Sequence, residues 1–257
     1  MKHFGLLGQD IAYSLSPLIH QEIAKRTKKE MTYVLLDGDQ QSLKPHLLAL
    51  KANTLHGLNV TKPYKSTIMQ WLDDFSPIAL RLGAVNTIIY KDGQKIGDNT
   101  DYYGFKQLLI SNNVDVKDQN VLLLGNGGAA RACYAVLTDL GAKVKVACRK
   151  PNNHHALFKN MISYEDVAED FDIYVNTVSN GVDVIEAFEL KYQKEALMID
   201  INYQHHITQP MSHFIDRING IDMLIYQAVY SQSLWYDQEM TLDQADIEAI
   251  KGAVFHE

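Results

Sequence analysis

Two polar segments of this 257-residue chain contain residue types that could move a proton. One runs from Asn59 to Lys65 and the other from Asp98 to Asp101. A lysine and an aspartate brought together form a cationic proton donor and an anionic partner that orients it. A glycine-rich turn of the type that binds dinucleotides follows at Gly125 to Gly128. A proton donor beside a nicotinamide is suited to reducing a carbonyl, because a proton must accompany the hydride.

The glycine-rich turn fits the pattern G-x-G-x-x-A between a predicted strand and a predicted helix. Gly125 permits the tight turn, Gly127 lets the backbone approach a pyrophosphate, and N–H groups at the helix start bind the anion. The alternative is an ordinary strand-helix turn. The predicted cofactor contacts here are Gly125, Asn126, Gly127, Gly128 and Ala129.

The next predicted strand ends at Cys148, and Arg149 and Lys150 follow it. An NAD-selective fold usually has an acidic residue here that binds the ribose hydroxyls. A guanidinium can instead pair bidentately with a 2′-phosphate, so Arg149, assisted by Lys150, favours NADP over NAD. The alternative is a solvated basic pair at the end of a strand.

The apolar pattern predicts the elements that must position these residues, and it indicates an α/β fold. The first half alternates strands and helices, which indicates a largely parallel sheet, and functional residues then gather past the carboxyl ends of its strands. The second half is predicted to be doubly wound. Strands are predicted at His3–Gly8, Tyr33–Leu36, His56–Val60, Val121–Leu124, Lys143–Cys148, Asp172–Val175, Ala196–Ile201 and Met223–Tyr226. Helices are predicted after Ser16-Pro17, at Leu43–Ala52, at Gly127–Leu140 and after the capping-box pattern Thr241-Leu242-Asp243-Gln244.

Composition excludes several classes of protein. A net charge of −7 and the lack of a Lys/Arg run argue against a nucleic-acid partner. The two cysteines, Cys133 and Cys148, have neither disulfide-framework nor zinc spacing. The histidine pairs at 154–155 and 205–206 are adjacent and expected in loops, so no metal is predicted. No apolar stretch approaches the length of a membrane span, and we expect a cytoplasmic protein without a membrane partner.

Taken together, these segments resemble the shikimate dehydrogenase family, reductases of aromatic amino-acid precursor synthesis. With the glycine-rich turn and the segment from Gly220 to Gln227, the resemblance covers nearly the whole chain. It rests on Ser14-Leu15-Ser16-Pro17, on Asn59-Val60-Thr61 through Lys65, on Gly83-Ala84-Val85-Asn86-Thr87, and on Gly97 through Phe105.

The resemblance implies a two-domain enzyme with its active site in the cleft between the domains. Residues 1–101, completed by C-terminal helices at 226–257, would bind the substrate, and residues 102–225 would form an NADP-binding Rossmann domain. The implied reaction is the NADPH-dependent, reversible reduction of 3-dehydroshikimate to shikimate. The partner is then a small molecule, and the enzyme a monomer or a homodimer.

The resemblance also implies roles for single residues. Lys65 matches the catalytic lysine, with Asp101 as its partner, and Ser14 and Ser16 match serines that bind the substrate carboxylate. Ile201 and Gly220 match positions beside the cofactor. The expected substrate-binding residues are Ser14, Ser16, Asn59, Thr61, Asn86, Asp101, Tyr203 and Gln227.

Each of these residues also has an ordinary interpretation. Ser14 and Ser16 could cap the following helix, and a lone lysine such as Lys65 is most often solvated. Asn86, Thr87, Asn99 and Asp101 could be turn residues, and Gln227 could face solvent.

Departures from the family pattern are Asn126, Cys148 with the residues after Lys150, Lys62 and Gln21, and none removes a proposed catalytic group. Three rival functions remain. A quinate/shikimate dehydrogenase using NAD would be expected to have an acid near Arg149. A catalytically silent binding paralogue would not need both Lys65 and Asp101. A dinucleotide-binding structural module leaves the polar segments before residue 102 unexplained.

Overall fold

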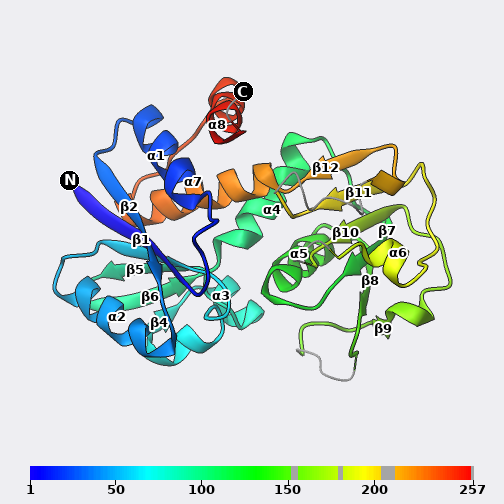
Figure 1. Ribbon diagram of the computed structural model, residues 1–257, viewed down its shortest axis with the longest axis horizontal. Coiled ribbons are helices and arrows are strands. Elements are labelled where there is room, and N and C mark those ends of the chain that lie inside the picture. Colours follow the sequence, from blue (N-terminus) through cyan, green and yellow to red (C-terminus); the bar gives the residue numbers. More distant parts are fainter. Residues whose placement is uncertain (152–155, 179–181, 204–211, 256–257) are drawn as a thin grey trace. The chain divides into compact units, whose positions relative to one another are not determined.

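The computed structural model describes residues 1–151, 156–178, 182–203 and 212–255 (Figure 1). The histidine pairs at 154–155 and 205–206 lie outside the described residues. The chain divides into two units, which we treat separately. Unit 1 comprises Met1–Gly104 and Ile225–Glu257, and unit 2 comprises Phe105–Leu224. In the described part of the chain, no helix has the length and apolar composition needed to cross a membrane.

Unit 1 is built on a six-stranded mixed sheet. Its strands are β1 (Lys2–Gly8), β2 (Met31–Asp37), β3 (Gly57–Val60), β4 (Asp74–Phe75), β5 (Thr87–Lys91) and β6 (Gln94–Asp98). Their spatial order is β2-β1-β3-β5-β6-β4. β1 pairs in parallel with β2 and β3, as the sequence predicts, whereas β5 is antiparallel to both β3 and β6. Asp92 and Gly93 join β5 to β6 with φ values of 53° and 80°, the left-handed conformation of a tight hairpin.

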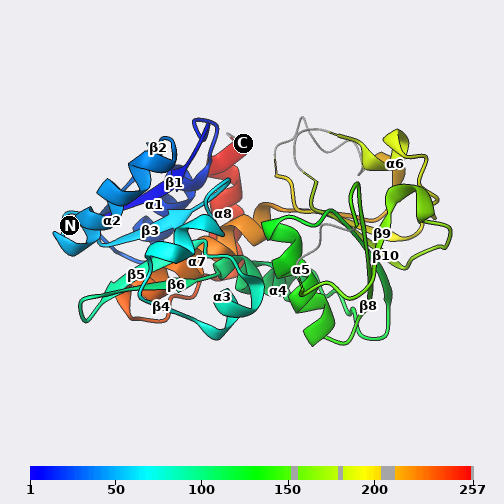
Figure 2. The ribbon, with the colours of Figure 1, turned by 90° about the horizontal axis from the view of Figure 1, so that it is seen from below.

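Helices cover both faces of this sheet (Figure 2). On one face, α1 (Ser16–Arg26) contacts β1 and β2, and Trp235 of α7 (Ile221–Tyr236) packs with Phe4, Leu6 and Tyr33. On the other face, α2 (Leu43–Lys51) supplies leucines that pack against Leu58 and Val60 of β3. A short helix, α3 (Pro77–Leu82), precedes β5.

Trp235 ties the C-terminal part of unit 1 to its N-terminal strands. Its indole is stacked on Phe4, with ring centroids 4.4 Å apart, and its Nε1 donates to the carbonyl of Ile88 at 3.0 Å. The indole also lies against the backbone of Gly57, where an added Cβ would be 2.3 Å from Nε1. Only glycine therefore fits at residue 57 without displacing the tryptophan.

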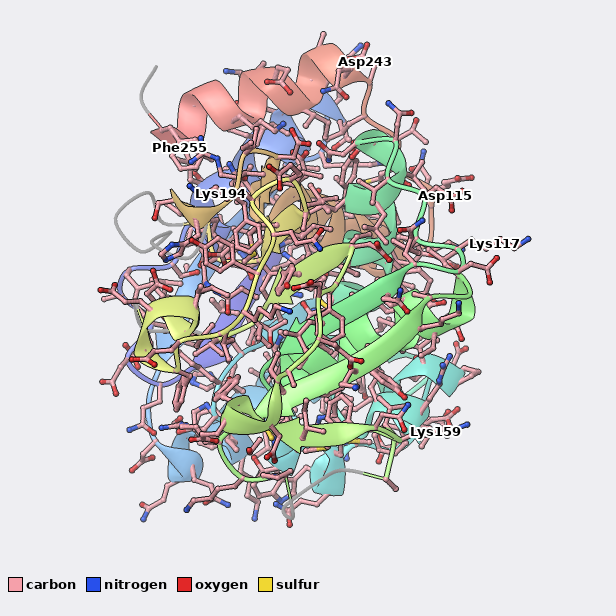
Figure 3. The ribbon with its side chains drawn as sticks, turned by 90° about the vertical axis from the view of Figure 1, so that its right-hand side faces the viewer. Asp115, Lys117, Lys159, Lys194, Asp243 and Phe255 are labelled. Atoms are coloured by element: carbon pink, nitrogen blue, oxygen red, sulfur yellow. The ribbon has the colours of Figure 1, made fainter. Side chains whose placement is uncertain are left out.

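Two predictions for the C-terminal region are wrong. Met223–Tyr226 is not a strand, because it forms part of the 16-residue helix α7. A four-residue apolar run fits either a strand or a helix. Beyond this run, Gln227 and Ser231 are buried too, so other elements enclose the helix. The final helix, α8 (Gln244–Phe255), exists, but Asp243 caps it rather than Thr241 (Figure 3). Asp243 Oδ1 accepts from the Asp246 N–H at 2.8 Å.

Unit 2 contains a six-stranded parallel sheet in the order β12-β11-β10-β7-β8-β9. Its strands are β7 (Asn120–Leu124), β8 (Lys143–Cys148), β9 (Met161–Ser163), β10 (Ile173–Asn176), β11 (Leu197–Asp200) and β12 (Arg217–Asn219). Its helices α5 (Gly128–Asp139) and α6 (Val184–Ala187) lie on opposite sides of the sheet (Figures 1 and 2). The doubly wound prediction is confirmed, and the strand order reverses between β7 and β10. The helix α4 (Thr100–Ser111) connects unit 1 to unit 2.

We expect Gly57→Ala to destabilise unit 1 by about 1–3 kcal/mol, because the new methyl group overlaps the indole of Trp235. Denaturant unfolding would measure this cost. The matched background is Trp235→Leu, in which the same glycine substitution should cost clearly less. Equal costs in the two backgrounds would contradict the contact.

Candidate active site

The predicted lysine and aspartate meet in unit 1. Lys65 lies in the loop after β3, and Asp101 lies in the first turn of α4. Lys65 Nζ donates to Asp101 Oδ2 at 2.5 Å. The two side chains are 21% and 10% exposed, so the pair is sheltered but open to a small molecule. A carboxylate in the first turn of a helix is also stabilised by the helix dipole.

The second oxygen of Asp101 has its own donor. Asn86 Nδ2 donates to Asp101 Oδ1 at 2.8 Å, while Asn86 Oδ1 accepts from the backbone N–H of Thr100 at 2.7 Å. Because a backbone N–H can only donate, this contact fixes which way the Asn86 amide points. The carboxylate is therefore held at both oxygens, and Lys65 faces a carboxylate of fixed orientation.

Asn59 lies behind this pair and is buried. Tyr33 donates its hydroxyl to Asn59 Oδ1 at 2.8 Å, and Asn59 Nδ2 donates to Asn86 O and to Thr87 Oγ1 at 3.2 and 3.0 Å. Both ends of the Asn59 amide thus contact protein groups. Asn59 supports Asn86 from the interior.

Gln227 comes from α7, and it does not face solvent. It is buried, and its Oε1 accepts from Thr100 Oγ1 at 3.3 Å. This contact places Gln227 beside the helix turn that carries Asp101. Four residues of this region were not singled out as site residues: Tyr33, Thr87, Thr100 and Ser231. Thr87 and Thr100 lie within recognisable motifs, whereas Tyr33 and Ser231 have no sequence signal of their own.

Ser14 and Ser16 form a short turn before α1. Ser14 Oγ accepts from the backbone N–H of Ser16 at 3.2 Å and donates to Ser16 Oγ at 3.1 Å. The cap position of α1 is Leu15, without a side-chain cap, so neither serine hydroxyl serves as its N-cap. Thr61 follows β3 and is partly exposed, and its N–H donates to the carbonyl of Leu7 at 2.9 Å.

His20 lies one turn along α1 from Ser16 and is completely buried. Its ring is stacked on Tyr33 with centroids 4.1 Å apart, and its Nδ1 lies 3.2 Å from Gln232 Nε2, which donates. The proton of the neutral ring is therefore on Nε2. Burial lowers the pKa of His20 to about 3, although the neighbouring Asn59 side chain partly opposes this shift.

The glycine-rich turn of unit 2 joins β7 to α5. Gly125 has φ of 104°, and a Cβ there would be 2.6 Å from Thr177 Oγ1. Gly127 is the N-cap of α5 without a side-chain cap, and beyond its chain neighbours no atom of the described residues lies within 4 Å of where its Cβ would be. Asn126, Gly128 and Ala129 are partly exposed around it. The first N–H groups of α5 therefore lack a side-chain cap, and the space beside Gly127 is open. Both features suit the approach of a phosphate.

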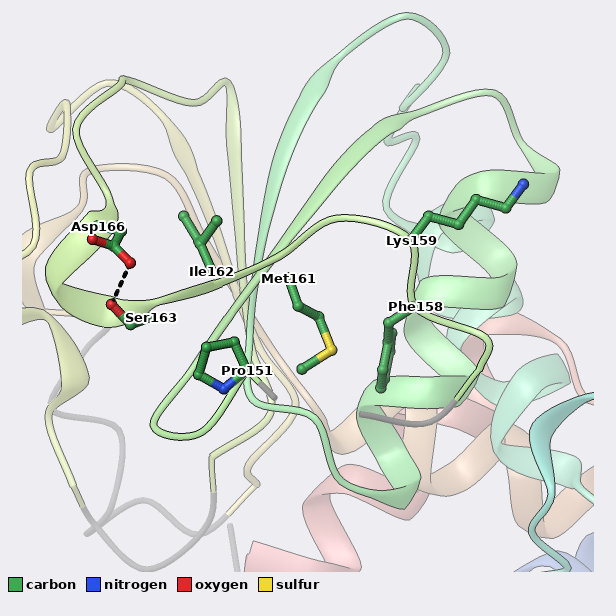
Figure 4. Close-up of a pocket in the computed structure, with 7 residues that line it drawn as sticks. All are labelled: Pro151, Phe158, Lys159, Met161, Ile162, Ser163 and Asp166. Atoms are coloured by element: carbon green, nitrogen blue, oxygen red, sulfur yellow. Dashed lines mark hydrogen bonds between the residues drawn. The ribbon is translucent and has the colours of Figure 1, made fainter. Parts of the chain in front are cut away.

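Arg149 and Lys150 follow β8, and both are exposed. A pocket of about 300 Å³ lies beside the edge strand β9, and Pro151 forms part of its wall (Figure 4). Ser163 and Asp166 close one side of it through a hydrogen bond of 2.7 Å. Besides the apolar side chains of Pro151, Phe158, Met161 and Ile162, its lining includes Lys159, Ser163 and Asp166. Because the carboxylate of Asp166 would repel an anion, we assign the pocket no role in anion binding.

The remaining predicted residues lie just past the ends of β11 and β12 in unit 2. Gly220 packs directly on Ile201, because a Cβ at residue 220 would be 2.0 Å from the Ile201 carbonyl oxygen. Tyr203 is partly buried two residues further on. Asp200, at the end of the strand, is buried, and burial raises the pKa of its carboxyl group.

Comparison with known proteins gives a consistent result. Residues 6–88 match the family model of the shikimate dehydrogenase substrate binding domain. A relative from Clostridium beijerinckii, named shikimate dehydrogenase (NADP(+)), is 35% identical over 256 residues, which cover 95% of this chain and 94% of the relative.

Two solved structures agree in fold over nearly the whole chain. Shikimate 5-dehydrogenase from Thermus thermophilus, solved with NADP(H) and shikimate, has a TM-score of 0.85 at 29% identity, covering 98% of this chain and all of the other. Shikimate 5-dehydrogenase from Listeria monocytogenes, solved with shikimate and NAD, has a TM-score of 0.80 at 25% identity, covering 99% and 96%.

The two glycines of the turn should respond differently to a methyl group. Gly127→Ala should keep stability within about 0.5 kcal/mol, since its surroundings are open, but weaken dinucleotide binding. Gly125→Ala should cost about 1–3 kcal/mol, because its φ is unfavourable for alanine. Denaturant unfolding and NADP⁺ titration of both variants would test this. Unchanged NADP⁺ affinity in Gly127→Ala would contradict the phosphate approach.

His20 should make folding stability depend on pH. Its pKa is lowered from 6.5 in the unfolded chain to about 3 in the folded protein. Below pH 6.5 the unfolded state therefore binds a proton that the folded state does not, and stability falls as the pH falls, by about 2 kcal/mol at pH 5. His20→Phe keeps a ring beside Tyr33 but cannot be protonated. Between pH 7 and pH 5, its free energy of unfolding should therefore fall by about 2 kcal/mol less than that of the unsubstituted protein.

The buried aspartates do not disturb this comparison. Burial raises the pKa of Asp98 and of Asp200, which favours the folded state at low pH in both proteins and cancels between them. Equal pH slopes in denaturant unfolding would contradict the assignment.

Proposed function

Because the chain belongs to the shikimate dehydrogenase family, we propose that it catalyses the reversible, NADP-dependent reduction of 3-dehydroshikimate to shikimate. Lys65 is the proton donor and acceptor in this proposal, and Asp101 is its partner. The reaction serves the synthesis of chorismate and the aromatic amino acids. The observation that carries the proposal is the sheltered hydrogen bond between Lys65 Nζ and Asp101 Oδ2.

The chemistry assigned to this pair follows from its geometry. When bound, NADPH supplies the hydride. The Lys65 ammonium stabilises the negative charge that develops on the substrate oxygen and delivers a proton to it. Asp101, held by Asn86, keeps the ammonium group in place, so it does not have to reorient during the reaction. In the oxidative direction, Lys65 takes the proton back.

The substrate is a small polyhydroxylated acid, and the polar side chains of unit 1 suit its groups. We assign the carboxylate to the hydroxyls of Ser14 and Ser16. The ring hydroxyls are assigned to Thr61, Asn86, Asp101 and Gln227, which include donors and acceptors. Tyr203 is a further proposed contact from unit 2. For Asn59 we propose a supporting role, since Tyr33 takes its Oδ1 and its two amide protons have three acceptors inside the protein, whereas the amide nitrogen of Asn86 donates to Asp101.

We assign substrate binding to unit 1 and NADP binding to unit 2. The pyrophosphate is assigned to the turn from Gly125 to Ala129, where the open space at Gly127 suits it. Arg149 and Lys150 would hold the 2′-phosphate, which favours NADP over NAD. Ile201 and Gly220 would lie beside the cofactor. A cytoplasmic enzyme, either a monomer or a homodimer, completes the proposal.

The first experiment is nicotinamide absorbance with shikimate and NADP⁺, with parallel assays of NAD⁺ and quinate. We expect turnover with shikimate and NADP⁺, and Lys65→Ala should lower kcat by about 10² to 10⁴ with a smaller change in KM. Lys95→Ala is the matched control, because it removes another lysine of unit 1 that is paired with an aspartate, Asp73, at 2.6 Å.

The outcomes separate the rival functions. A preference for quinate and NAD⁺ would show that the enzyme is instead a quinate/shikimate dehydrogenase. The assay with NAD⁺ is needed because the solved relative from Listeria contains NAD. A folded protein that binds NADP⁺ but turns over nothing would indicate a silent paralogue. An unimpaired kcat in Lys65→Ala would remove the lysine from the mechanism.

A further inference from the structure

Ser231, on α7, is fully buried and contacts three other elements of unit 1. Its oxygen lies 2.9 Å from Asn59 Nδ2, 3.0 Å from Thr87 Oγ1 and 3.2 Å from Thr100 Oγ1. It also donates to the carbonyl of Gln227, one helical turn earlier, at 2.9 Å. These partners come from β3, β5, α4 and α7 itself.

The direction of these hydrogen bonds can be worked out. A serine hydroxyl has one proton, and that of Ser231 goes to the Gln227 carbonyl. Tyr33 occupies Asn59 Oδ1, so the amide of Asn59 presents its N–H groups to the hydroxyls. The oxygen of Ser231 is therefore an acceptor, both for Asn59 and for a threonine hydroxyl.

Thr87, Thr100 and Ser231 form a hydroxyl triangle, with oxygen separations of 3.0 to 3.2 Å. The triangle contacts two of the proposed substrate-binding groups. Asn86 Oδ1 lies 3.0 Å from Thr87 Oγ1 and 3.1 Å from Thr100 Oγ1, and Gln227 Oε1 lies 3.3 Å from Thr100 Oγ1. Among the described residues, none of its three hydroxyls is hydrogen-bonded to Lys65, so the triangle acts on the binding groups rather than on the proton donor.

Resting on the proposed function, we propose that Ser231 is a positioning residue for substrate recognition. Its oxygen gives a threonine hydroxyl of the triangle an acceptor inside the protein. Since Thr100 donates its proton to Gln227 Oε1, the threonine that uses this acceptor is Thr87. Without Ser231, the Thr87 proton turns to Asn86 Oδ1 at 3.0 Å or to Thr100 Oγ1 at 3.1 Å, and Asn86 is one of the groups proposed to meet the substrate ring hydroxyls. Loss of Ser231 would then weaken substrate binding more than proton transfer.

The test compares Ser231→Ala with Ser233→Ala in the full-length enzyme. Ser233 lies on the same helix and donates in the same way to the carbonyl four residues earlier, Val229, at 3.0 Å, but it is outside the triangle. We expect Ser231→Ala to raise KM for shikimate about tenfold, because an unsatisfied buried hydrogen-bonding group costs roughly that factor in binding. KM for NADP⁺ should stay at the unsubstituted value, and kcat should fall less than KM rises.

A purely structural role predicts a different pattern. General destabilisation lowers the active fraction, and therefore apparent kcat, without a selective change in KM for shikimate. Equal KM values for shikimate in Ser231→Ala and Ser233→Ala would overturn the inference. Should Ser231→Ala fail to fold, Thr100→Val removes another hydroxyl of the triangle while keeping its shape, and it must show the same selective rise in KM. Absence of shikimate turnover by the unsubstituted enzyme would overturn the proposed function and this inference with it.

Discussion

The buried carboxylate of Asp101 is the constraint on which the rest of unit 1 depends. Burying a charged group is costly unless it is paired and hydrogen-bonded. Here the two oxygens have different donors, the ammonium of Lys65 and the amide of Asn86. Because the backbone of Thr100 fixes the Asn86 amide in turn, the pair is organised before any ligand arrives.

Sheet topology explains why these groups converge. β5 runs antiparallel to β3 and β6, with Asn59 opposite Thr87 and Thr87 opposite Asp98. The end of β3, the start of β5 and the end of β6 therefore lie at one edge of the sheet. A polar segment lies at each of these strand ends. The segments are Thr61 to Lys65 after β3, Asn86 with Thr87 at the start of β5, and Asp98 to Asp101 at the end of β6. An all-parallel sheet would place the residues before β5 at the opposite edge.

Local signals in the sequence were sufficient for much of the fold. Buried strands such as β1 and β7 contain apolar runs, β8 alternates lysine with valine before Ala147 and Cys148, and the glycine-rich turn is contained within six residues, so all of these were predictable. The antiparallel pair β5 and β6 was not predicted, and neither was the helical state of Met223–Tyr226, where four apolar residues fit a strand equally well. The motif residues of the site could be named from the family resemblance, but several of their hydrogen-bond partners, including Tyr33 and Ser231, could not. Asn59 and Ser231 are 172 residues apart, and nothing local in either segment indicates that they meet.

The proposed ligand contacts come from backbone groups in unit 2 and from side chains in unit 1. This difference explains which departures from the family pattern each unit tolerates. In unit 2 the proposed phosphate contacts come from backbone N–H groups, so the turn depends on the conformation of Gly125 and the open space at Gly127. Asn126 between them needs only to allow that backbone. In unit 1 the groups are side-chain atoms whose protons and lone pairs point in defined directions. A change at Asn86 or Ser231 removes a hydrogen-bond partner from buried polar groups. A substitution is therefore tolerated at residue 126 of the turn but costly at Gly125, and costly in unit 1 at buried polar residues such as Asn86 and Ser231.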